Sequence, residues 1–303
     1  IVNLGRMGVP VYSVDSNPRT ITFLSRYARK VLSPDIKDSE DGYIDFLISL
    51  AKTLEHKPVL FITGDLMLLA ILKHRDRLEP YYHMPFPPLE TVENLAEKVQ
   101  FYNMLDQYGV DYADTFYPED VQEVRTVASS LNYPYIIKPV HSGEFVNRFH
   151  NKCLKADSGD ELISLYELAS QTEDTLIVQQ ELQGTERYLV YMYFDRHSNP
   201  LAVCCYKKLR ITPIDYGNAC ACQTMWDQEI VDIGVNLLKK IGYHGLAEAE
   251  IQRDKRDGRL KLVEINARST TENRLTAKCG MNMEYIAYCQ MLGKPVEIAN
   301  KAE

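Results

Sequence analysis

A strand-like run near the C-terminus, in which polar side chains recur at every second position, constrains this chain more than any other feature. The run RLKLVEINAR, residues 259–268, is apolar at first and then carries Glu264, Asn266 and Arg268. Because successive side chains of a strand point to opposite faces, this carboxylate, amide and guanidinium project from the same side of a sheet. The fold must therefore place this polar row either in water or in a site.

A second carboxylate is predicted beside this row. Glu250 ends the preceding strand-like run, and a charged turn with Asp257 and Gly258 joins the two runs as a hairpin. Glu250, Glu264 and Asn266 would then offer hard oxygen donors, which suit Mg²⁺ when substrate phosphates complete its coordination. The alternation of glutamate with alanine in AEAEIQ fits a solvated sheet face equally well, so spacing alone leaves both interpretations open.

The bulk composition excludes several classes of protein. The 303 residues are 45% hydrophobic and 25% charged, which is enough for two or three globular domains. No segment approaches the length of apolar sequence that spans a membrane. The net charge of −8 argues against a non-specific binder of nucleic acid or of acidic membranes.

The seven cysteines form no paired CxxC frame of the kind that binds zinc. The only clusters are Cys204-Cys205 and Cys220-Ala221-Cys222. We expect reduced thiols packed in the strands of a cytoplasmic protein, with a metal or redox role as the alternative.

Residues 1–85 are predicted to form a parallel α/β domain. Apolar runs at 9–15 and 57–65 flank a helical pattern at 41–54, and this order is typical of such a sheet. The opening residues resemble the end of a helix, so we expect one strand to be missing before them. Asp65 is predicted to cap the following helix rather than to contact a ligand.

Residues 86–303 are predicted to be α+β with antiparallel strands. The predicted helices are 89–109, 124–132, 161–171 and 229–242, and the predicted strands are 133–140, 175–182, 186–195, 200–210, 245–254 and 259–268. The stretch 211–228 is expected to be a loop that contributes to specificity. Its Tyr216 and Trp226 would line the cleft or pack against the core.

Three further features suit a nucleotide, although each has a plainer interpretation. Lys138 follows three apolar strand residues and would be either a point charge for phosphate or a strand-end lysine that reaches water. The loop 141–155, with Gly143, could cover phosphates with its backbone N–H groups. The linker 178–186 could pair with an adenine edge and offer Glu186 to a ribose, or could be a plain turn. Neither a P-loop nor a dinucleotide glycine fingerprint occurs.

In their order along the chain, YPYIIKPV, LIVQQELQGTE and LKLVEINAR resemble the ATP-grasp superfamily over roughly residues 90–290. The resemblance implies an N-terminal parallel α/β domain over residues 1–85. A two-subdomain ATP-grasp fold would follow, with subdomains at about 86–178 and 179–303. YKKLRITPIDYGNACACQT and EINARSTTENRLTAKCGMN look most like the carboxylate–amine ligase branch, which includes D-aspartate ligases.

The resemblance also implies a role for each matching residue. Mg²⁺ or Mn²⁺ would be bound by Glu250, Glu264 and Asn266. ATP would be bound by Lys98 and Lys138 at its phosphates, by Gly143 and either Lys152 or Lys155 in the covering loop, by Glu181 and Leu182 at the adenine, and by Glu186 at the ribose. The transferred phosphate or the substrate carboxylate would be bound by Arg268, Lys208 and Arg210.

The implied reaction joins two small molecules, with amino acids among the candidates. A carboxylate attacks the γ-phosphate of ATP, and an amine displaces phosphate from the resulting acyl phosphate. The products are an amide or peptide bond, ADP and phosphate. Dimerisation is expected at the level of the family. A kinase that releases a phosphorylated product and a nucleotide-binding module without catalysis are the alternatives.

Overall fold

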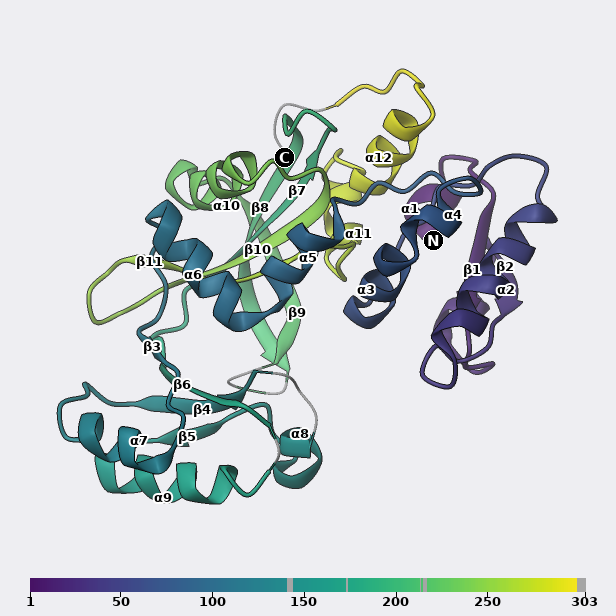
Figure 1. Cartoon of the computed structure of the whole chain (residues 1–303). Helices are drawn as coiled ribbons and strands as arrows, with labels where there is room; N and C mark the ends of the chain where they lie inside the picture. The colour runs from purple at the N-terminus through teal and green to yellow at the C-terminus, as the bar shows by residue number, and fades with distance from the viewer. Residues whose placement is uncertain (141–143, 173, 213, 215–216, 299–303) are drawn as a thin grey trace.

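The strands of the described residues form three separate sheets (Figure 1). The structure is a computed structural model, and it describes residues 1–140, 144–172, 174–212, 214 and 217–298. In the view of Figure 1 the N-terminal sheet lies to the right, a five-stranded sheet lies in the centre and a four-stranded sheet lies below it.

The N-terminal segment contains a two-stranded parallel sheet with helices beside it. Its elements are α1 (Val2–Gly5), β1 (Val11–Asp15), η1 (Ile21–Leu24), β2 (Ala28–Leu32), α2 (Glu40–Lys52), α3 (Asp65–Lys73) and α4 (Arg75–Leu78). The helix predicted at 41–54 and the strand predicted at 9–15 are confirmed as α2 and β1. The partner of β1 is β2, which was not predicted because ARKVL carries two charged residues in five.

The strand predicted over residues 57–65 is wrong. Within the described residues this stretch forms only an isolated parallel bridge, between Val59 and His83. The N–H of His83 donates to the carbonyl of Pro58, and the N–H of Leu60 donates to the carbonyl of His83. The pairing stops there because the segment after His83, MPFPP, contains three prolines, which have no N–H to donate.

The helix predicted over residues 89–109 is two helices, α5 (Leu89–Ala96) and α6 (Lys98–Tyr108). The break is at Glu97, whose carboxylate accepts hydrogen bonds from the N–H groups of Val99 and Gln100 at 3.2 and 2.8 Å. Glu97 therefore acts as the N-cap of α6 and makes Lys98 the first residue of that helix.

The four-stranded sheet is antiparallel, in the order β3-β6-β4-β5. Its strands are β3 (Thr115–Phe116), β4 (Tyr135–Pro139), β5 (Leu154–Ala156) and β6 (Leu176–Gln180), and its helices are α7 (Val121–Ala128), α8 (Glu144–Phe149) and α9 (Gly159–Ala169). The sheet and the helices share a core that includes Val124, Ile137, Phe145, Leu162 and Val178.

The five-stranded sheet is also antiparallel, in the order β11-β10-β7-β8-β9. Its strands are β7 (Arg187–Phe194), β8 (Pro200–Thr212), β9 (Asn218–Met225), β10 (Gly245–Arg253) and β11 (Leu260–Asn266). Helix α10 (Gln228–Lys240) contacts β7, β8 and β10, and α12 (Met283–Met291), which follows α11 (Asn273–Lys278), contacts β7 and β10. β9 lies within the stretch predicted to be a loop, whose alternating small and polar residues, NACACQT, gave no apolar signal.

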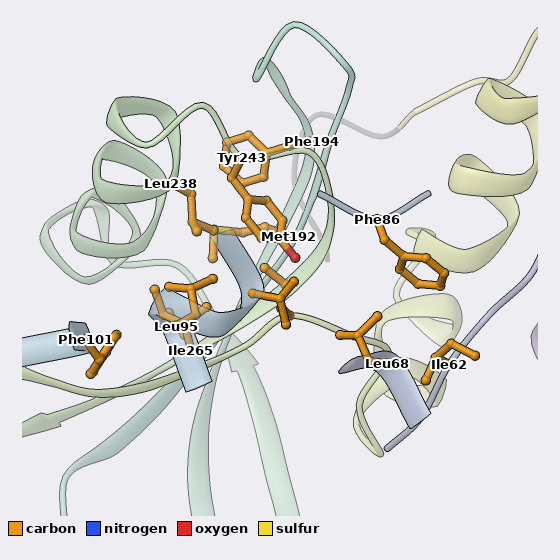
Figure 2. Close-up of a cluster of buried hydrophobic side chains, with 14 of the residues drawn as sticks. Ile62, Leu68, Phe86, Leu95, Phe101, Met192, Phe194, Leu238, Tyr243 and Ile265 are labelled. Carbon is orange, nitrogen blue, oxygen red and sulfur yellow. The ribbon is translucent and has the colours of Figure 1, made fainter. Parts of the chain in front are cut away.

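One hydrophobic core joins the N-terminal segment to the five-stranded sheet. Figure 2 shows Leu68 of α3, Leu95 of α5 and Ile265 of β11 in the same cluster as Met192 of β7. Helix α3 contacts α5, and α5 contacts β11. This packing fixes the start of α3 relative to the end of β11. Within the described part of the chain, no helix has the length and apolarity needed to cross a membrane.

Candidate active site

A cleft of about 360 Å³ is lined by residues of both larger sheets. The four-stranded sheet contributes Ile136, Lys138, Gln179 and Gln180, and the five-stranded sheet contributes Arg187, Leu189, Lys208, Glu248, Glu250, Gln252, Glu264 and Asn266. Arg268 and residues 270–272 extend the lining beyond the end of β11. The predicted metal ligands therefore face the same cleft as the predicted phosphate lysine Lys138.

The hairpin of β10 and β11 brings the predicted metal ligands together. Glu250 lies directly opposite Glu264 in the ladder, and Glu248 lies opposite Asn266. The amide nitrogen of Asn266 donates to Oε1 of Glu264 at 3.2 Å. The row is only partly solvated, because Glu248 is 4% exposed whereas Glu264 is exposed to the cleft.

Three glutamates crowd the floor of the cleft, which is formed by Glu248, Glu250, Glu264 and Asn266 of the β10–β11 hairpin with Lys208 and Arg268 beside them. The surrounding protein and the neighbouring carboxylate of Glu250 raise the pKa of Glu264 above its usual range, although water in the cleft still reaches its side chain. Burial, and then the charge of Glu272, raise the pKa of Glu248 to about 8. Lys208 offsets part of this charge, with its Nζ 2.6 Å from Oε1 of Glu250.

The donor set of this floor fits Mg²⁺. Carboxylate and amide oxygens are the ligands that Mg²⁺ prefers, and a cation would relieve the repulsion between Glu250 and Glu264. Within the described residues, no group of three or more His, Cys, Asp and Glu side chains is arranged to hold a metal ion by itself.

The two predicted phosphate lysines occupy different positions. Nζ of Lys138 donates to Oε1 of Gln179 at 2.7 Å and to the hydroxyl of Tyr102 at 3.3 Å, and the side chain lines the cleft. Lys98 does not line the cleft, and its Nζ donates to the carbonyl of Val140. Burial, and then the charge of Lys138, lower the pKa of Lys98 to about 8.

The linker predicted to bind adenine lines the cleft, but much of its backbone is already bonded. The N–H of Glu181 donates to the carbonyl of Pro134 at 3.0 Å. The carbonyl of Glu181 accepts from Nη2 of Arg256, and that of Leu182 accepts from Nε2 of Gln252, both at 3.0 Å. An adenine would use the remaining hydrogen-bonding capacity of this linker or displace one of these side chains.

Glu186 lies outside the cleft lining, and Arg187 takes its place there. The carboxylate of Glu186 binds Nζ of Lys207 and the hydroxyl of Tyr188, both at 3.2 Å. The Tyr188 side chain packs in the core on the α10 side of the sheet. In this conformation Glu186 does not face the cleft, and its binding of a ribose stays a prediction.

The covering loop is described only in part. Gly143 lies outside the described residues, as does Tyr216. Lys152 lines the cleft, whereas Nζ of Lys155 lies 3.3 Å from a carboxylate oxygen of Glu181. Lys152 is thus the better-placed of the two lysines left open by the sequence.

The three residues predicted to bind transferred phosphate or substrate carboxylate do not meet at one point. Arg268 and Lys208 line the cleft. Arg210 is exposed and does not line it, because the pairing of β8 with β9 shifts register between Lys208 and Arg210. Trp226 also lies outside the lining and packs against the core, the second of the two positions expected for it.

Asp65 does not cap α3, since Gly64 is the N-cap and Asp65 is the first helical residue. Its carboxylate instead binds Arg268 in a bidentate pair, with Nε at 2.7 Å and Nη2 at 3.0 Å. The preference for a helix cap was therefore wrong. A contact across 203 positions gives no local signal in the sequence.

Several cleft residues were not predicted. They include Arg187, Glu248, Gln252, Thr270, Thr271 and Glu272. The alternation of Glu248, Glu250 and Gln252 along β10 was a usable signal, because these positions share one face of a strand. None of the seven cysteines, which all lie in the described residues, forms a disulfide. Cys204 and Cys205 are buried in β8, as expected for strand-packed thiols, whereas Cys220 is exposed and Cys289 lies in α12.

Comparison with known proteins places the chain in a family. Residues 97–296 match the model of the carbamoyl-phosphate synthase L chain, ATP-binding domain. The chain belongs to this family. The ATP-grasp fold expected from the sequence is confirmed, and every residue that lines the cleft lies within the matched segment.

Among curated relatives of this ATP-grasp protein, a D-aspartate ligase from Enterococcus faecium (strain Aus0004) is 25% identical over 280 residues. That alignment covers 85% of this chain and 65% of the relative. A carbamoyl phosphate synthase large chain from Mycobacterium sp. (strain JLS) is 21% identical over 289 residues, covering 89% of this chain and 25% of the relative. The chain thus spans less than two thirds of the length of either protein.

Two solved structures share the ATP-grasp fold. An L-amino acid ligase from Bacillus licheniformis has a TM-score of 0.68 at 18% identity, and the match covers 98% of this chain and 71% of that one. The biotin carboxylase domain of a 2-oxoglutarate carboxylase from Hydrogenobacter thermophilus, a dimer in complex with MgADP and bicarbonate, has a TM-score of 0.72 at 15% identity. That match covers 98% of this chain and 67% of the carboxylase domain.

Proposed function

We propose that this protein is an ATP-dependent carboxylate–amine ligase that forms an amide or peptide bond through an acyl phosphate. The observation that supports this most strongly is the cleft floor, where the oxygen donors Glu250, Glu264 and Asn266 lie beside the cations Lys208 and Arg268. Oxygen donors next to guanidinium and ammonium groups suit the transfer of a phosphoryl group between anions.

The proposed substrates are amino acids, or small molecules that carry the same groups. The relatives that support this are named a D-aspartate ligase and an L-amino acid ligase. We further propose an N-terminal α/β domain over residues 1–85 and an ATP-grasp domain over 86–303, with subdomains that meet near residue 178. We also infer a cytoplasmic location, in keeping with cysteines that form no disulfide in the described residues, and a homodimer, in keeping with the dimeric carboxylase domain.

In the proposed mechanism the side chains position reactants and offset charge, and none acts as a nucleophile. Glu250, Glu264 and Asn266 would hold Mg²⁺, or Mn²⁺, which would neutralise charge on the phosphate oxygens. Lys138 would pair with the nucleotide phosphates from the opposite wall of the cleft. Arg268 would donate N–H groups to the transferred phosphate as the acyl phosphate forms.

The proposed chemistry proceeds in two displacements. A substrate carboxylate oxygen attacks the γ-phosphorus of ATP, the bond to the β-phosphate oxygen breaks, and ADP leaves. The nitrogen of an unprotonated amine then attacks the acyl carbon, inorganic phosphate leaves with its bonding electrons, and the new amide nitrogen gives up one proton to the departing phosphate. The walls of the cleft would favour the amine over water as the attacking group.

The direct test is the release of ADP and phosphate from Mg-ATP in the presence of pools of amino acids and amines, singly and in pairs. Release that requires both a carboxylate and an amine, with a new amide detected by mass spectrometry, is the expected result. Release with a single acceptor and a stable phosphorylated product would show a kinase. ATP binding without turnover over a broad set of pools would favour a binding module.

We expect the use of ATP to decline above about pH 8, because the pKa of Lys98 lies near that value. Above it Lys98 is neutral, and the positive charge that it would exert on the phosphates from outside the cleft lining is lost. Measured as kcat/KM for ATP against pH, the wild type should lose activity on the alkaline side. Lys98→Arg should keep its activity there, because a guanidinium stays charged.

The same shift predicts the pH dependence of stability. Between about pH 8 and its ordinary value of 10.5, Lys98 is protonated in the unfolded chain and neutral in the folded one. The unfolded state then binds more protons, so this group makes the free energy of unfolding rise with pH in that window. The activity prediction for Lys98 would be contradicted if Lys98→Arg lost kcat/KM for ATP on the alkaline side as the wild type does.

A further inference from the structure

We propose that Asp65 is a positioning residue that holds Arg268 in the orientation needed to bind the transferred phosphate. The inference rests on the proposed function and deepens it, since the N-terminal segment would then contribute directly to the ATP-grasp site. Asp65 itself does not line the cleft, so its effect would pass through Arg268.

The guanidinium of Arg268 is held at two edges. Nε and Nη2 donate to the two carboxylate oxygens of Asp65 at 2.7 and 3.0 Å. Nη2 also donates to Oδ1 of Asn266 at 2.9 Å. A planar guanidinium bound bidentately by a carboxylate and by a third acceptor cannot rotate without breaking these bonds.

This arrangement leaves one edge of the guanidinium for a ligand. A guanidinium has five N–H donors, and the bonds to Asp65 and Asn266 use those on Nε and Nη2. Nη1 of Arg268 has no hydrogen-bond acceptor within the described part of the chain. Because Arg268 lines the cleft next to Asn266, this remaining pair of donors suits an anionic phosphate oxygen.

The pair is poorly suited to a role in stability. The side chain of Asp65 is 61% exposed, whereas that of Arg268 is 19% exposed. Ion pairs with a largely exposed partner contribute little to the free energy of unfolding. The contact instead fixes the half-buried guanidinium of Arg268 in the cleft, and Asp65 makes this contact from the solvent-exposed surface of the N-terminal segment.

The packing of the N-terminal segment keeps Asp65 in place. Asp65 begins α3, and α3 is anchored through Leu68 in the core that α5 and β11 share (Figure 2). The carboxylate is therefore delivered from a rigid element next to the end of β11. A site on rigid elements is more accurately positioned than one on loops.

The first part of the test compares Asp65→Asn with Asp41→Asn. Asp41 is the matched control, because it lies in the same N-terminal segment and its carboxylate binds Arg77 at 2.6 Å while being 76% exposed. We expect Asp65→Asn to lower kcat by about 10- to 100-fold and to raise KM for ATP by about tenfold, with the melting temperature unchanged. Asp41→Asn should change none of these quantities.

The second part is a double-mutant cycle. If Asp65 acts only through Arg268, Asp65→Asn should have no further effect on kcat once Arg268→Ala is present. The proposal would be overturned if the kcat losses of the two single variants multiplied in the double variant, or if the melting temperature fell in step with activity. Either result indicates a general effect on the fold.

The third part needs no turnover. We expect Asp65→Asn to lower the affinity for a non-hydrolysable ATP analogue that carries a γ-phosphate by about tenfold. The affinity for Mg-ADP should stay unchanged. Both affinities can be measured by calorimetry. Equal effects on both nucleotides, or none, would overturn the positioning role. Selective weakening in a protein without amine-dependent turnover would support the positioning role and refute only the ligase function.

Discussion

Glu264→Gln and Asn266→Ala are each expected to lower turnover by about 10³-fold or more while the fold stays intact. Bound metal supplies several kcal/mol of charge stabilisation during phosphoryl transfer, and each 1.36 kcal/mol is a factor of ten in rate. Glu264→Gln removes one of two carboxylates that face each other in the β10–β11 ladder. Asn266→Ala removes the amide oxygen beside them.

The two variants can be measured by ADP release across a Mg²⁺ titration, with thermal unfolding in the presence of a chelator. Without metal, Glu264→Gln should unfold at a temperature no lower than the wild type, because it relieves the repulsion by Glu250 that raises the pKa of Glu264. Glu229→Gln is the matched control, since this carboxylate is exposed on α10. Full activity in both site variants would show that the metal assignment is wrong.

Lys208→Met is expected to lower both turnover and stability. Nζ of Lys208 lies 2.6 Å from Glu250, and the two side chains are 6% and 20% exposed. Removing one partner of a buried pair leaves an uncompensated charge, which typically costs about 3 kcal/mol. Chemical denaturation would measure this loss. Turnover should fall as well, because Lys208 offsets charge on the cleft floor.

The chain offers a matched control at the next position. Lys207 forms an ion pair with Glu186 at 3.2 Å, but their side chains are 39% and 46% exposed. Lys207→Met should therefore change the free energy of unfolding by less than about 1 kcal/mol. The double variant Lys208→Met/Glu250→Gln should regain part of the lost stability. If Lys208→Met and Lys207→Met were equally stable, Lys208 would not be compensating a buried charge.

Much of the metal site could be predicted because its signals are local. Glu264 and Asn266 alternate along a single strand, and the Asp257-Gly258 turn sets the hairpin that brings Glu250 beside them. Strand alternation and turn chemistry act over a few residues, so a sequence displays them directly. The same logic could have identified Glu248, which shares a face with Glu250.

Other features depend on partners that are distant in the sequence. The strand predicted at 57–65 did not form, because its partner segment after His83 is rich in proline. The helix predicted at 89–109 broke at Glu97, whose carboxylate caps the second half. In both cases the apolar residues recur as the prediction assumed. Hydrogen bonds that this pattern does not record decided whether the strand formed and where the helix broke.

By itself the sequence determined the order of β4, β6, β7, β8, β10 and β11, the hairpin that carries the predicted metal ligands, and the resemblance to ATP-grasp proteins, but it did not show β3, β5 or β9. Only the tertiary structure decided which cations reach that hairpin: Lys208 enters the cleft while Arg210 does not, and Asp65 binds Arg268 from 203 positions away. The physical reason is the separation along the sequence over which each interaction acts. Backbone periodicity and turns are set by neighbouring residues, whereas an ion pair requires only that two charged groups meet after the core has packed.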